Sequence, residues 1–82
     1  MNIKILKAVS DGTRFKIINT LKDGELCVCY FPQRLGISQS ATSQHFKVLR
    51  SAKLVNMRRE GTKRLYRLSA KGRSVLEDIL TW

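Results

Sequence analysis

Gly36 stands between two short stretches of helical character, and this break restricts the fold more than any other feature of the chain. After it, a run begins at Ser38 in which Thr42, Phe46 and Leu49 recur at the spacing of a helix with one buried face. Two short helices joined by a glycine turn are typical of a helix-turn-helix, whose second helix enters the DNA major groove by its N-terminal half.

Two further helices are predicted before this motif. The apolar stretch at residues 3–9 indicates a short helix that stops near residues 10–12. A second helix is predicted from Ser10 as its N-cap, and residues 22–24 close its pattern. Its buried face is expected to carry the large apolar side chains that recur at three-residue spacing, Phe15, Ile18 and Leu21, with Ile17 beside them.

Alternation replaces the helical period after the motif. Residues 54–60 and 63–68 each place apolar side chains on one face, and Gly61-Thr62 lies between them, which predicts a β-hairpin. A final amphipathic helix is expected after Ser69. The predicted fold class is therefore mostly α with a small β-hairpin: a single domain over residues 1–82, in the winged helix-turn-helix order of four helices, two strands and a helix.

The charge balance indicates the kind of partner. Sixteen Lys and Arg against six Asp and Glu give a net charge of +10 over 82 residues, which favours a polyanion such as double-stranded DNA. An interaction module for RNA or for an acidic protein is an alternative. Neither a long uncharged apolar stretch nor a signal-peptide pattern is present, so no membrane association and a cytoplasmic location are expected.

The predicted DNA contacts fall into two groups. The exposed side of the second motif helix offers hydrogen-bonding and basic side chains, Gln39, Ser40, Ser43, Gln44 and Lys47, together with His45, which we expect to face phosphate rather than a metal ion. The hairpin tip offers Arg58, Arg59, Lys63 and Arg64 for the phosphate backbone or the minor groove. The alternatives are ordinary solvated residues and charges that protect a sheet edge from aggregation.

Two cysteines, Cys27 and Cys29, are spaced so that their side chains point to the same side only in extended backbone. Pro32 disfavours helix before it, so the next helix should start no earlier than about Tyr30. Cys29 would then lie near a helix N-terminus, which favours the thiolate that binds soft ions. Each cysteine could equally be a small buried hydrophobic residue. A disulfide between them is not expected, because its ring would be small and strained.

These residues together resemble the ArsR/SmtB family of metal-sensing winged-helix repressors. The resemblance covers roughly residues 5–68 and rests on the runs KAVSDGTRFKIINTLKDGELCVC, ELCVCYFPQRLGISQSATSQHFKVLRSAKLV and RREGTKRLYRLS. Its most specific part is the pentapeptide at residues 25–29, which looks like the family's metal box.

The resemblance implies a homodimeric repressor that binds operator DNA without a cofactor and releases it when a thiophilic ion binds Cys27 and Cys29. Arsenite or antimonite is the preferred inducer. Arsenical repressors often add a cysteine three positions after the second one, where this chain has Pro32. The matching positions of the dimer interface are apolar here: Ile3, Ile5, Leu6, Val75, Ile79, Leu80 and Trp82.

Other functions remain open at this point. The thiols could form a redox switch, or the protein could regulate transcription without sensing any ion. An enzyme acting on a small-molecule substrate is not expected, because the chain lacks a nucleophile and base pair and a glycine-rich phosphate loop, and has a single histidine.

Overall fold

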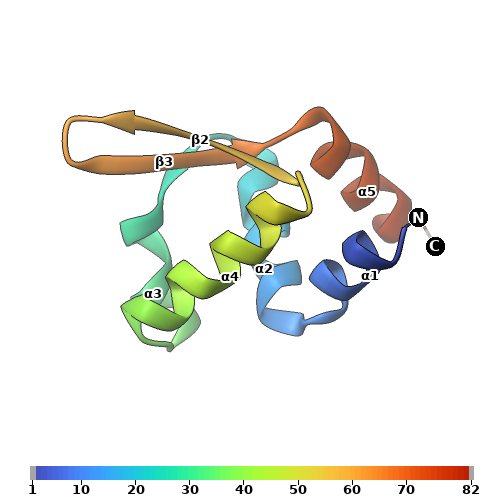
Figure 1. Cartoon of the computed structure of the whole chain (residues 1–82), viewed down its shortest axis with the longest axis horizontal. Coiled ribbons are helices and arrows are strands. Elements are labelled where there is room, and N and C mark those ends of the chain that lie inside the picture. The colour runs from blue at the N-terminus through green and yellow to red at the C-terminus, as the bar shows by residue number, and fades with distance from the viewer. Residues whose placement is uncertain (1, 82) are drawn as a thin grey trace.

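A computed structural model describes residues 2–81 of the chain. The helices and strands follow one another in the order expected for a winged helix (Figure 1). The elements are α1 (Ile3–Ser10), α2 (Gly12–Thr20), η1 (Leu21–Asp23), β1 (Leu26–Cys27), η2 (Val28–Tyr30), α3 (Phe31–Leu35), α4 (Gln39–Ser51), β2 (Val55–Glu60), β3 (Lys63–Leu68) and α5 (Ala70–Leu80), of which η1 and η2 are single 3-10 turns.

The helices begin where a side chain can accept a hydrogen bond from an otherwise unpaired backbone amide. Ser38 caps α4 through the amide of Ala41 at 3.0 Å, and Ser69 caps α5 through the amide of Gly72 at 2.9 Å. The cap predicted at Ser10 is wrong: the carboxylate of Asp11 caps α2 instead, whereas the Ser10 hydroxyl donates back to the carbonyl of Lys7 within α1. The amide of Arg14, which donates to Asp11, is the main cause that lowers the pKa of this carboxyl group.

The sheet is antiparallel in the order β1-β3-β2. Strands β2 and β3 form the predicted hairpin, with Val55 opposite Leu68, and Gly61 takes a positive φ of 62° in the turn. Strand β1 was not predicted, because its two residues are too few to show an alternating pattern. It pairs Cys27 with Leu65 and thereby attaches the cysteines to the hairpin.

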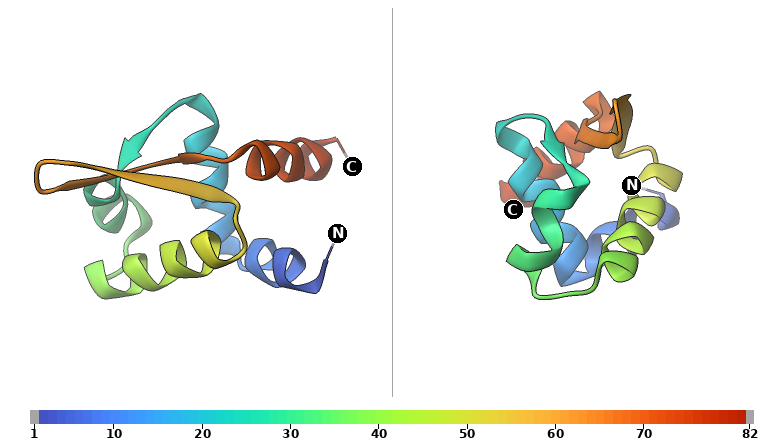
Figure 2. Two further views of the ribbon diagram at one scale, coloured as in Figure 1. Left: turned by 45° about the horizontal axis from the view of Figure 1, so that its top comes forward. Right: turned by 90° about the vertical axis from the view of Figure 1, so that its left-hand side faces the viewer.

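The core lies between the helices and the buried face of this sheet. Phe46 of α4 is at its centre, with ring centroids 5.1 Å from Phe31 and 4.2 Å from Tyr66. Thr42, Phe46 and Leu49 are buried, as the spacing of α4 predicted. The hairpin extends beyond this core as a wing, and both termini lie at the opposite end of the molecule (Figures 1 and 2).

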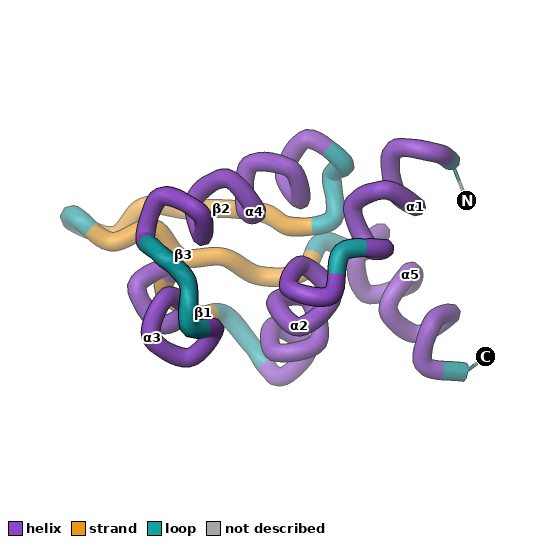
Figure 3. Tube along the Cα trace, turned by 90° about the horizontal axis from the view of Figure 1, so that it is seen from below, coloured by secondary structure: helices purple, strands orange, loops and turns teal. Residues whose placement is uncertain are grey.

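Helix α5 packs closely against the chain that leads into β2. A Cβ atom on Gly72 would collide with the carbonyl oxygen of Leu54, so only glycine fits at this crossing. The same carbonyl accepts a hydrogen bond of 3.0 Å from the amide of Ser69. In the tube view, α1 and α5 occupy the end remote from the wing tip (Figure 3). Within residues 2–81 no helix combines the length and the apolar character needed to cross a membrane.

Candidate nucleic-acid interface and cysteine site

The polar side of α4 is exposed along its length. Three buried residues of α4 turn one face inward, and the predicted groove-reading side chains of the helix are all exposed: Gln39, Ser40, Ser43, Gln44 and Lys47. The hydroxyl of the buried Thr42 donates to the carbonyl of Ser38 at 2.9 Å, so its hydrogen-bond donor has a partner within the helix. The reading face is thus a rigid, acid-free strip.

His45 does not belong to this strip. Its ring is half-buried, and its Nδ1 atom lies 3.2 Å from a guanidinium nitrogen of Arg14, on α2. Arg14 also donates to the carbonyls of Ala8 and Lys7, which ties α1, α2 and α4 together. Its position one residue from the core face turns the ring of His45 toward α2, and its contact with DNA phosphate stays a prediction.

The wing tip carries three of the four predicted basic residues as free cations within the described chain. Arg59 pairs across the strands with Arg64, and Lys63 follows the turn; all three are exposed. Like charges placed opposite each other destabilise a hairpin, so an anion that neutralises Arg59 and Arg64 would stabilise it. Phosphate of a DNA backbone is such an anion.

Arg58 differs from its neighbours, because acidic partners already hold it. Its guanidinium donates to both carboxylate oxygens of Glu25, at distances down to 2.7 Å, and lies 3.0 Å from Glu60. This hydrogen bonding lowers the pKa of Glu25 and raises that of Arg58. Arg58 thereby attaches the segment before the cysteines to the wing, and its predicted phosphate contact would compete with these carboxylates.

Cys27 lies in extended backbone and Cys29 in a 3-10 turn, so neither is in an α-helix, the condition that joint binding of one ion by both would need. Cys27 ends β1 and Cys29 lies in η2, and α3 begins at Phe31, with Pro32 in its first turn. The two sulfur atoms are joined as a disulfide, contrary to the expectation that no bridge would form. The non-helical backbone brings the side chains together, and the amide of Cys29 donates to the Cys27 Sγ atom at 3.3 Å.

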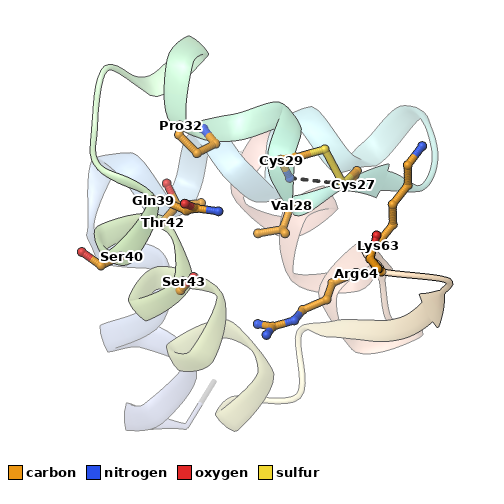
Figure 4. A pocket seen from close by; sticks show the side chains of 11 residues that line it. Cys27, Val28, Cys29, Pro32, Gln39, Ser40, Thr42, Ser43, Lys63 and Arg64 are labelled. Atoms are coloured by element: carbon orange, nitrogen blue, oxygen red, sulfur yellow. Dashed lines mark hydrogen bonds between the residues drawn. A yellow bond between two sulfur atoms is a disulfide. The ribbon is translucent and has the colours of Figure 1, made fainter.

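The cysteine pair opens onto a cavity of about 530 Å³ that it shares with both DNA-reading elements. Figure 4 shows the cysteines on one side, the first turns of α4 on another, and Arg64 pointing from the wing into the space between them. Its lining comprises Cys27, Val28, Cys29 and Pro32, then Gln39, Ser40, Thr42 and Ser43 of α4, and Thr62, Lys63 and Arg64 of the wing. Sequence alone could not have shown this cavity, because it joins three segments that are far apart along the chain.

A family model described as "Bacterial regulatory protein, arsR family" matches residues 11–57, which is more than half of the chain. The chain belongs to the arsR family. The resemblance found in the sequence is therefore confirmed, and with it the winged-helix fold of a DNA-binding transcriptional regulator rather than an enzyme.

This arsR-family chain is similar in sequence to a transcriptional regulator and to an arsenical resistance repressor. It is 43% identical over 74 residues to the HTH-type transcriptional regulator Rv2034 of Mycobacterium tuberculosis, covering 90% of this chain and 69% of that protein. It is 38% identical over 76 residues to an arsenical resistance operon repressor of Staphylococcus aureus, covering 93% and 70%.

Solved structures agree with the fold. HlyU from Vibrio cholerae superposes with a TM-score of 0.85 at 38% identity, over 94% of this chain and 85% of that one. A homodimeric winged helix-turn-helix domain from Mycobacterium bovis, described as a possible ArsR-family regulator, gives a TM-score of 0.82 at 29% identity, over 95% and 72%.

The apolar residues predicted for an interface between copies of this arsR-family chain separate into two sets. Ile3, Leu6 and Leu80 expose 71%, 55% and 54% of their surface, as an unpaired contact face would. Ile5 and Val75 are instead buried in the subunit's own core and expose little surface to a second copy, so their place in the interface stays a prediction. Ile79 is half-buried, and Trp82 lies outside the described residues.

Proposed function

We propose that the reduced protein binds operator DNA as a homodimer and releases it when arsenite or antimonite binds Cys27 and Cys29. One observation supports this above all: the cysteine pair, the start of the reading helix and the wing tip line a single cavity. A ligand on the thiolates would therefore lie directly against the groups that contact DNA.

In the DNA complex, the first turns of α4 enter the major groove and the wing follows the backbone. Gln39 and Gln44 can form paired hydrogen bonds with adenine. The hydroxyls of Ser40 and Ser43 can hydrogen-bond to base edges, and Lys47 can contact phosphate. Arg59, Lys63 and Arg64 neutralise phosphates beside the groove.

Dimerisation would pair the exposed apolar residues at the end remote from the wing. Ile3 and Leu6 of α1 and Leu80 of α5 supply this surface, and the relative from Mycobacterium bovis is itself homodimeric. Two copies related by a twofold axis would present two reading helices, so operator half-sites are expected about 34 to 36 Å apart or at a multiple of that spacing.

The coupling between ligand and DNA follows from where each cysteine is attached. Cys27 is paired with Leu65 of the wing strand, and Cys29 lies in the turn that leads into α3. An ion held by both thiolates would fix the wing strand relative to the first helix of the motif. A coupling free energy of about 1 to 3 kcal/mol would then weaken DNA binding about 5- to 150-fold.

The donor set suits a soft, thiophilic ion. Cys27 ends strand β1, Cys29 lies in the 3-10 turn η2 and is exposed, and thiolates select soft ions over hard ones. In the described part of the chain, no three His, Cys, Asp or Glu side chains gather as a metal site, so the protein itself offers two donors. Binding must release thiol protons and should weaken as the pH falls.

Fluorescence anisotropy of reduced protein on its own promoter fragment tests the proposal. Titration with arsenite, antimonite, cadmium and zinc should release the DNA with the first two ions. Cys27→Ser and Cys29→Ser should bind DNA normally and lose the response, whereas Val28→Ala, which keeps both thiols, should retain it. Full response in both serine variants would refute the sensor.

A thiol redox switch is a second candidate, favoured by the disulfide between the cysteines. Oxidation would then lock the segment in the conformation described here, and reduction would free it. Anisotropy of the oxidised protein before and after addition of dithiothreitol, with no ion present, distinguishes the two: a change in DNA affinity that Cys29→Ser abolishes supports the switch.

A further inference from the structure

The cavity beside the cysteines is far larger than one ion requires. Its volume of about 530 Å³ falls within the range of about 300 to 1,000 Å³ that is usual for sites of small organic ligands. An ion held by Cys27 and Cys29 would sit at one wall only. The space toward α4 and the wing would stay open to a larger molecule.

The lining of this cavity favours an anion. Lys63 and Arg64 carry its charge, and no Asp or Glu is among the lining residues. In Figure 4 the guanidinium of Arg64 points into the cavity, and Lys63 extends alongside Cys27. Gln39, Ser40 and Ser43 add hydrogen-bonding groups from α4 on the opposite wall. Carboxylates are well matched to such a mixture of cations and polar donors.

The wall that holds the two cysteines lacks a third sulfur donor. Pro32 lines the cavity next to the cysteines and has no group that can coordinate an ion. Since residues 2–81 hold no site of three potential ligands, a trigonal ion on the two thiolates needs one donor from outside the protein.

We propose that the cavity binds a low-molecular-weight thiol bearing carboxylates, whose sulfur completes the coordination of the metalloid on Cys27 and Cys29. This inference rests on the proposed metalloid response. Two molecules of the low-molecular-weight thiol first reduce the Cys27–Cys29 disulfide and leave as their own disulfide. Each As–O bond of arsenite is then exchanged for an As–S bond, and each thiol proton leaves in a water molecule. Arsenic stays in the same oxidation state, and the carboxylates of the added thiol lie against Lys63 and Arg64.

This occupant gives the release of DNA a direct cause. Its negative charges take the place that a DNA phosphate would occupy beside Arg64, and its bulk separates the start of α4 from the wing tip. The thiol complex should therefore release DNA more completely than the ion with two protein thiolates alone.

The experiment uses protein reduced with a phosphine, so that no thiol is present except the one added. Arsenite is titrated without a thiol, with mercaptosuccinate, with 2-mercaptoethanol and with cysteamine, which are anionic, neutral and cationic. Native mass spectrometry reports the composition of the complex, and the near-ultraviolet absorption of arsenic–thiolate bonds reports its affinity, both in the absence of DNA. We expect a ternary complex of protein, arsenic and mercaptosuccinate, about tenfold tighter than that with 2-mercaptoethanol.

Matched variants test which residue recognises the carboxylates of mercaptosuccinate. Arg64→Ala should lose this preference for mercaptosuccinate, whereas Arg67→Ala should keep it, because Arg67 projects from the opposite face of β3 and is absent from the lining. Free arsenite–thiol complexes form to the same extent in the presence of either variant. The ratio of the two variants' affinities for arsenite with mercaptosuccinate therefore isolates the contribution of the cavity. Pro32→Cys supplies a third protein thiol and should make arsenite binding independent of any added thiol.

The remaining outcomes overturn the inference in distinguishable ways. Arsenite that binds the phosphine-reduced protein as tightly without a thiol, and forms no ternary complex, refutes the cavity ligand and leaves the two-cysteine sensor intact. Equal affinity with all three thiols refutes recognition of carboxylates. Failure of arsenite to bind under every condition, including in Pro32→Cys, removes the sensor and the cavity ligand together.

Discussion

The two halves of the helix-turn-helix differ sharply in how the molecule holds them. Helix α4 has 13 residues, a serine cap and three buried side chains. The cysteine segment, residues 26–35, consists of a two-residue strand, a 3-10 turn and the five residues of α3, and within it only Phe31 is buried. Local opening requires less free energy where fewer apolar contacts are broken. Helix α4 is therefore the more firmly held element, and displacement of the cysteine segment requires less free energy.

An aromatic contact is among those that join the two halves. The Phe31 ring packs edge-on against Phe46, with centroids 5.1 Å apart, so a displacement of the cysteine segment reaches α4 through this pair. Arg34 of α3 makes local contacts instead: its guanidinium lies 3.7 Å from the centre of the Tyr30 ring and donates to the Tyr30 carbonyl at 3.2 Å. These local contacts move with the segment and do not oppose its motion.

The largest predicted effect comes from core truncation. Phe46→Ala should lower the free energy of unfolding by about 3 to 5 kcal/mol, because it removes the ring that Phe31 and Tyr66 both contact. Leu35→Ala, in the half-buried end of α3, should lower it by only about 1 kcal/mol. Urea denaturation of both variants measures the two losses in free energy of unfolding, and equal losses would contradict the contrast between the two halves.

Removal of the α4 cap should have an intermediate effect. Ser38→Ala loses the hydrogen bond to the amide of Ala41 and should lower stability by about 1 kcal/mol. It should also weaken DNA binding, since the frayed turn carries Gln39 and Ser40. Ser69→Ala removes the cap of α5 and also the hydrogen bond of its hydroxyl to the Lys53 carbonyl, and it is the control: thermal unfolding should show at least as large a loss, with DNA affinity unchanged at temperatures where the protein is folded.

The adjacent arginines of the wing should differ in their contribution to DNA binding. Arg59→Ala should reduce the slope of log affinity against log salt by about 0.9, the value for one lost phosphate contact. Arg58→Ala should change the slope much less, because Glu25 and Glu60 already neutralise that guanidinium. Anisotropy titrations at several salt concentrations measure both slopes, and a larger change for Arg58 would overturn its assignment.

The smallest effect concerns pH. Because Arg58 depresses the pKa of Glu25 below its ordinary value of 4.5, the pair stabilises the fold above that pH and loses its contribution as the pH falls through the lower, folded-state pKa. A carboxyl NMR titration should therefore place the midpoint of Glu25 below 4.5. In Arg58→Gln the midpoint should rise toward the ordinary value; an unchanged midpoint would show that another group is responsible.

Periodicity in the sequence was sufficient for the elements that are long enough to repeat. The spacing of Thr42, Phe46 and Leu49, the alternation around Gly61 and the proline after the cysteines each reflect a local rule of helix, strand or turn, and the structure confirms these elements. The family resemblance followed from the same local runs and is confirmed as well.

Only the tertiary structure decided how these elements combine into a site. Strand β1 exists because the wing offers a partner for two residues, and Arg58 is neutralised because folding brings Glu25 beside it. His45 turns toward Arg14, and the cysteines share a cavity with α4 and the wing tip, for the same reason. The sequence determines which residues can form regular structure because those interactions are local. Contacts between distant segments depend on how buried faces pack, and packing is defined only once the whole chain has folded.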